Sequence, residues 1–167
     1  MNLSPAVPRL RAVRYQEFEA AVRRLVAGAR DEAVRAFGAE TVARVVRDDE
    51  LTGIAAAGEL DDDAAAAFTV ARANAATAGA AELRALLTRI DDGVLSDGDM
   101  DPELLIAVSA LEHWTTYLET GHRDEIHELA VRAVEQVDHR APADLDDFLA
   151  GPEMAAEYAR IERLLAA

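Results

Sequence analysis

The chain contains no cysteine and no lysine, and each absence excludes a class of chemistry. Without cysteine there can be no disulfide, no thiolate metal ligand and no cysteine nucleophile. Without lysine the phosphate-binding motif G-x-x-x-x-G-K-[ST] cannot occur, because its lysine is the group that reaches the phosphates. Thiol catalysis and P-loop nucleotide chemistry are therefore excluded.

The sequence is also poor in aromatic residues and in long apolar runs. Aromatics make up 5% of the 167 residues. No stretch approaches the roughly 20 consecutive apolar residues that span a bilayer, and the first residues lack the apolar region of a secretory signal. Alanine supplies much of the 51% hydrophobic content. We therefore expect a soluble, cytoplasmic protein that does not bind membranes and whose helices pack closely around few large side chains.

The charge is strongly negative and unevenly distributed. The net charge is −15, and all 17 cationic side chains are arginines. Residues 1–30 carry six arginines against two glutamates, so the remaining chain carries −19. Such a field repels nucleic acid and attracts basic partners or cations. Arginine-rich, alanine-rich composition is also typical of a GC-rich bacterial genome, so the acidity is either a general background or serves a partner.

The apolar residues recur at helical spacing almost throughout, and nothing alternates with period two. We predict an extended lead-in over residues 1–14 and a single all-α domain over 15–167. That domain would be a bundle of about six to seven helices with short connections. The predicted helices cover residues 15–37, 39–52, 62–78, 80–91, 102–119, 123–138 and 152–166, with a short helical turn at 145–149. Gly38 would cap the first of them.

The clearest helix boundaries surround the segment 102–119. Asp101 is a capping residue and Pro102 suits the first helical position, while Gly121 can end the helix. This helix carries the main aromatic cluster, Trp114 and Tyr117. Both fall on an apolar face, which favours core packing, and the alternative is an exposed anchor for a partner.

Four histidines occur, and three of them allow a metal-binding alternative. His113, His122 and His127 could form a site across two helices, together with nearby glutamates. Isolated histidines near helix ends are more often surface or capping residues. We therefore expect no metal and no cofactor. No serine lies in a G-x-S-x-G setting, which favours a non-enzymatic protein.

Three stretches, taken in order, resemble a known family. They are Arg9-Leu10-Arg11 leading into residues 15–25, residues 102–121 with Val108-Ser109-Ala110-Leu111 at their centre, and Gly151-Pro152 leading into residues 158–165. Their order and spacing are similar to those of the small all-helical bacterial family catalogued as domain of unknown function 416. Residues 38–100 depart from that family, because they lack its aromatic-rich segments. The resemblance implies an all-α fold and no known activity.

These observations lead to two functional hypotheses. The first is a non-enzymatic acidic helical protein that binds a basic protein partner, in one version an immunity or antitoxin-type neutraliser of a nucleic-acid-directed toxin. The alternative is a metal- or small-ligand-binding helical bundle. Whether the protein self-associates stays open. Under the first hypothesis the expected partner contacts are Asp61, Asp62, Asp63, Asp97, Asp99, Asp101, Trp114 and Tyr117.

Overall fold

The computed structural model describes residues 11–95 and 99–167, without the side chains of residues 52, 56 and 57, and it is built from helices. In chain order the elements are α1 (Tyr15–Gly28), α2 (Asp31–Val45), α3 (Glu50–Ile54), a turn of π-helix η1 (Ala55–Glu59), α4 (Asp62–Asn74), α5 (Ala80–Asp92), α6 (Pro102–Thr120), α7 (Arg123–Arg140) and α8 (Pro152–Leu165). Within the described ranges the only β-type pairing is an isolated bridge between Leu60 and Val94. The prediction of an all-α bundle is confirmed.

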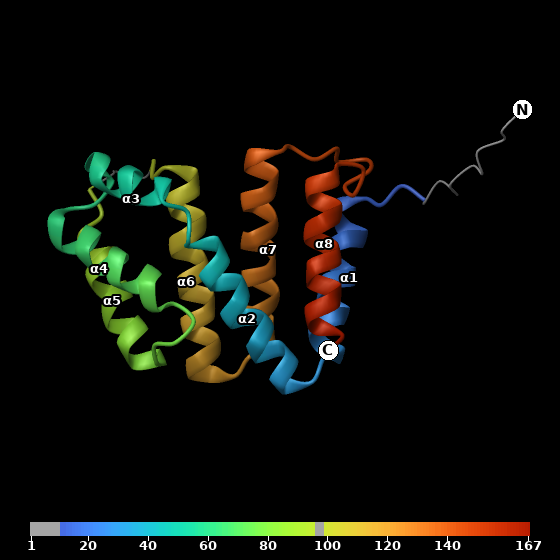
Figure 1. The fold of residues 1–167 in the computed structure, drawn as a ribbon, viewed down its shortest axis with the longest axis horizontal. Coiled ribbons are helices and arrows are strands. Elements are labelled where there is room, and N and C mark those ends of the chain that lie inside the picture. The colour runs from blue at the N-terminus through green and yellow to red at the C-terminus, as the bar shows by residue number, and fades with distance from the viewer. Residues whose placement is uncertain (1–10, 96–98) are drawn as a thin grey trace, which may run out of the picture.

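Helices α6 and α7 form a central hairpin that the other helices flank (Figure 1). On one side α5 packs against α6, and α4 packs against α5. On the other side α1 and α8 pack against α7, while α2 runs across the hairpin and contacts α6, α7 and α8. The segment from α3 to α5 therefore lies at one end of the long axis, and α1 with α8 lies at the other (Figure 1).

Alanine allows the close approach of α4 to its neighbour. Ala64, Ala67 and Ala71 are buried on one face of α4, beside Phe68. At the end of α5, a Cβ on Gly93 would lie 2.4 Å from the Cβ of Ala64, so only glycine fits there. The prediction that helices pack closely around few large side chains is confirmed for α4 and α5.

The prediction of one continuous helix over residues 15–37 is wrong, because the helix is interrupted between Gly28, the last residue of α1, and Asp31, the first residue of α2. The Arg123 guanidinium, at the start of α7, donates hydrogen bonds to the carbonyls of Val26 (2.8 Å), Ala27 (3.1 Å) and Ala29 (2.7 Å). These bonds satisfy carbonyls that an ending helix leaves without partners. A side chain some hundred residues along the chain thus stabilises the break.

The prediction that Gly38 caps a helix is wrong, because Gly38 lies buried inside α2. A Cβ at this position would lie 2.4 Å from Trp114 Cζ3 and 2.8 Å from Ile126 Cδ1. Glycine is required here by the indole ring that packs across α2, and not by the backbone conformation.

The predicted turn of helix at 145–149 is also absent, since these residues form bends and turns. Phe148 is buried there, and its N–H donates to the carbonyl of Val13 at 2.7 Å. The lead-in before α1 is thereby tied to the segment before α8.

The boundaries of α6 match the prediction. The Asp101 carboxylate accepts from the N–H of Glu103 at 2.9 Å and of Leu104 at 3.4 Å, and Gly121 ends the helix with φ of 70°. Its first half is apolar nearly all round, as a central buried helix requires. Neither α6 nor any other described helix combines the length and apolarity needed to cross a membrane.

Candidate functional site

The negative charge is concentrated at one end of the fold. Residues 48–103, which form α3 to α5 and the start of α6, hold fourteen carboxylate residues and three arginines, a net charge of −11. Residues 1–47, which include α1 and α2, carry +4. We call the surface formed by the described residues of this segment, 48–95 and 99–103, the acidic end, and without Asp97 these residues carry −10. It lies opposite α1 and α8 along the long axis (Figure 1).

The three aspartates at the start of α4 have different roles. Asp61 caps the helix, since its Oδ1 accepts from the N–H of Ala64 at 2.8 Å. Asp63 pairs with Arg89 of α5 at 2.6 Å, and these hydrogen bonds lower the pKa of the Asp63 carboxyl. Asp62 is exposed. Of this trio, Asp62 is the residue whose carboxylate is most available to a partner.

The predicted contacts in the loop before α6 are only partly described. Asp97 lies outside the described residues. Asp99 is exposed, whereas Asp101 is half-buried and its carboxylate caps α6. Among the described residues of this loop, Asp99 is therefore the exposed acidic group, and Asp101 has a structural role.

Trp114 belongs to the core and offers no surface to a partner. It is 2% exposed, and its Nε1 donates to the carbonyl of Ala75 at 2.8 Å. Tyr117 is half-buried and stacks on the indole ring with centroids 5.7 Å apart. Core packing is the correct interpretation for Trp114, and the expectation that it anchors a partner is withdrawn.

The three histidines do not form a common site. His113 Nδ1 lies 2.8 Å from Glu125 Oε2, His122 is exposed at the start of α7, and His127 is buried at 1% exposure. Neither ring nitrogen of His127 has a hydrogen-bond partner among the described residues. Because the ligand atoms of the three do not gather, the histidine-based metal alternative loses its geometric basis.

The structure does gather three other carboxylates, which sequence reasoning missed. Ligand oxygens of Asp48, Glu50 and Glu103 lie within 4.8 Å of one another. Arg140, at the end of α7, bonds to Asp48 and also donates to Glu103 at 3.1 Å. The guanidinium pairs with two of the three carboxylates, so the group ties α7 to the acidic end. Asp48 and Glu50 are close neighbours in the sequence, but no sequence signal links them to Glu103 of α6.

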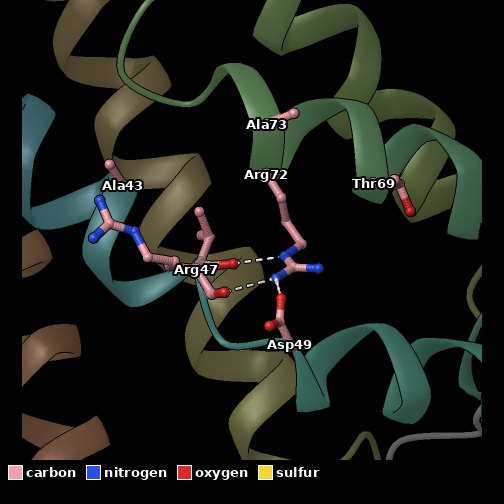
Figure 2. A pocket seen from close by; sticks show the side chains of 7 residues that line it. Ala43, Arg47, Asp49, Thr69, Arg72 and Ala73 are labelled. Carbon is pink, nitrogen blue, oxygen red and sulfur yellow. Dashed lines mark hydrogen bonds and ion pairs between the residues drawn. The ribbon is translucent and has the colours of Figure 1, made fainter.

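A pocket of about 420 Å³ lies between the end of α2 and α4 (Figure 2). Arg72 forms one wall and donates to the carbonyls of Val46 (2.6 Å), Arg47 (2.8 Å) and Asp48 (2.7 Å). Its guanidinium also lies 3.7 Å from Asp49. Arg72 thus satisfies the carbonyls at the end of α2 in the same way that Arg123 satisfies those at the end of α1. Its role at this pocket is structural.

A second buried ionic group joins α2 to α8. Glu157 is 4% exposed and accepts from Arg44 at 2.7 Å and from Arg160 at 2.9 Å. Arg160 also donates to Thr41 at 3.1 Å and lies 5.4 Å from the ring centroid of Phe37. Glu157 thus draws two arginines into the α2–α8 contact.

An apolar groove of about 660 Å³ lies at the opposite end from the acidic surface. The lead-in, the segment before α8 and α8 itself contribute Val13, Leu149 and Tyr158 to it. Burial and the neighbouring Glu162 raise the pKa of the Tyr158 hydroxyl. We call this the α1–α8 groove, because it lies at the end of the fold that holds these two helices. It is outside the acidic end.

No family model matches the chain, and the comparisons with curated proteins and with solved structures find no match either. The resemblance to domain of unknown function 416 stays a prediction.

Proposed function

We propose that the protein is a non-enzymatic binding protein whose acidic end takes a basic protein partner. The observation that carries this proposal is the net charge of −10 on the described residues 48–95 and 99–103, gathered at one end of the long axis. A general acidic background would be spread over the surface. Here the described residues at the opposite end, 11–28 and 141–167, have a net charge of only −2.

Clustered carboxylates act on association before they act on the final contacts. A surface of one sign raises the encounter rate with a partner of the opposite sign and suppresses encounters with like-charged molecules. Nucleic acid would be repelled for the same reason. The partner class that fits is a protein with a basic face.

A nucleic-acid-directed toxin is the more specific form of this partner. Its nucleic-acid site must be rich in arginine or lysine, because phosphate contacts supply most of the affinity. A carboxylate surface can occupy such a site in place of phosphate. Under this version the protein neutralises the toxin by covering its active face.

The test begins with capture of the partner on the immobilised chain, with washes at low and high salt and identification by mass spectrometry. The purified partner is then titrated against wild type and two triple variants. The first, Asp62→Asn, Glu82→Gln and Asp99→Asn, removes three exposed charges from the acidic end. The control, Asp124→Asn, Asp146→Asn and Glu153→Gln, removes three exposed charges elsewhere.

We expect association at low salt to slow about tenfold in the first variant, and by much less in the control, because steering depends on where the charge lies. The difference should disappear at high salt, where the Debye length shortens to a few ångströms. A partner with an acidic or neutral face, or equal slowing of both variants, would contradict the proposal.

A further inference from the structure

Where α5 of the acidic end packs against α6, one face combines an exposed leucine with carboxylates on both helices. It is formed by Arg84, Asp91 and Asp92 of α5 and by Leu105, Glu112 and Glu119 of α6, and we call it the α5–α6 face. Arg84, near the start of α5, bonds to Glu119 near the end of α6, so the two helices run antiparallel. Asp91 and Asp92 therefore come level with the first turns of α6.

The apolar part of this face is Leu105. Its side chain is 51% exposed, although Leu104 beside it is fully buried. Leu105, Glu112 and Glu119 recur every seven residues, which places them on one side of the helix. An apolar residue with a charged surround is the pattern of an interface anchor, since the surround excludes water once a partner is seated.

The charges on this face are only partly compensated. Arg84 donates to both oxygens of Glu112, at 2.6 Å and 2.8 Å, to Glu119 at 2.8 Å and to Thr116 at 3.1 Å. One guanidinium thus serves two carboxylates. Partial burial and repulsion from Glu112 and Asp92 raise the pKa of the Asp91 carboxyl, and the attraction of Arg84 offsets this only in part. A further cation placed beside Asp91 would relieve that repulsion.

We infer that the α5–α6 face is the docking surface for an amphipathic basic helix of the partner. The inference rests on the proposed function and names the surface and the partner segment. Two packed helices present a shallow groove into which a third helix fits. Leu105 and Glu112 lie about 10 Å apart along α6, given the rise per residue of a helix. The matching segment therefore carries an apolar residue and an arginine about two turns apart.

The test uses a designed probe, because the partner is not identified. The probe is a helical alanine-based peptide that carries leucine and arginine seven residues apart on one face. Its counterpart has glutamate in place of arginine. Each is titrated at low salt into the full ¹⁵N-labelled chain, and amide shifts are mapped onto the helices.

Two double variants provide the matched comparison. Leu105→Ser with Asp91→Asn alters the α5–α6 face. Leu145→Ser with Asp146→Asn makes the same chemical change at another site, where Leu145 is 75% exposed and Asp146 is also exposed. Circular dichroism and the unfolding midpoint establish that both variants are folded as wild type, and unaltered shifts outside the mutated sites provide a second check.

We expect saturable shifts at Asp91, Leu105 and Glu112 with the arginine peptide, and a loss of affinity of tenfold or more in the first variant only. Saturable binding that maps to the α1–α8 groove, or equal losses in both variants, overturns this inference and leaves the proposed function standing. No binding of the arginine peptide overturns this inference alone, because the proposed function does not require a helical partner segment. Equal binding of the glutamate peptide overturns both, because recognition would then not depend on positive charge.

Discussion

At the scale of single residues, several side chains have roles that their type alone does not indicate. Asp61 and Asp101 were predicted to meet a partner, yet their carboxylates cap α4 and α6. Helix caps could be recognised from sequence, because a short polar side chain stands before an apolar run. Gly38 was misread as a cap, because a glycine inside a helix and one at its end look alike in sequence.

We predict that Gly38→Ala destabilises the protein by about 1–2 kcal/mol. Alanine favours helix over glycine by about 1 kcal/mol, but its methyl group would overlap the Trp114 ring, and the overlap costs more. Urea unfolding followed by the fluorescence of Trp114, the single tryptophan, measures the effect. Gly28→Ala is the control, since a Cβ there meets open space. Equal midpoints for the two variants would contradict the packing argument.

At the scale of elements, the C-terminal ends of α1 and α2 are stabilised by arginines from other helices. Arg123 bonds to the end of α1 and Arg72 to the end of α2. Gln136 of α7 also donates to the Val45 carbonyl, at 2.9 Å. The periodicity of residues 15–37 continues through the break at Ala29 and Arg30, so no local signal marks it. The helices between clear caps, such as α6, were predicted within a residue or two because their termini are local.

The α2–α8 contact provides a prediction at this scale. Glu157→Gln should destabilise the protein by about 3 kcal/mol, because Arg44 and Arg160 would lose the buried carboxylate between them. Burial already lowers the pKa of the Arg44 guanidinium, and Glu157 is the main group that opposes this. Chemical unfolding at neutral pH measures the cost. Replacing Glu157, Arg44 and Arg160 together by apolar residues should cost less than Glu157→Gln alone, and Glu153→Gln, exposed on the same helix, should be close to neutral.

At the scale of the whole molecule, the net charge acts on both stability and association. The fold places the described residues 48–95 and 99–103, with a net charge of −10, at one end of its long axis, and residues 11–28 and 141–167, with a net charge of −2, at the other. The amino-acid sequence shows the charge asymmetry between the first 30 residues and the rest. It does not place Leu105 beside Asp91 and Glu112, because that juxtaposition depends on how α5 lies against α6.

We predict that added salt stabilises the isolated protein. Raising sodium chloride from low to moderate concentration screens the mutual repulsion of the excess carboxylates, which outweighs the screening of exposed ion pairs. A gain of about 1 kcal/mol would raise the melting temperature by roughly 2–4 °C for a chain of this size. Calorimetry across a salt series measures it. A melting temperature that falls with salt would show that attractive pairs dominate the electrostatics of this fold.

The amino-acid pattern by itself determined the helical class, most helix positions, the close packing around alanine and the sign of the surface, because these follow from local periodicity and composition. The tertiary structure decided where α1 ends, why position 38 must be glycine, that Trp114 is internal and which carboxylates stay available. Each of those depends on side chains brought together from distant parts of the chain, and spacing along one helix does not encode them.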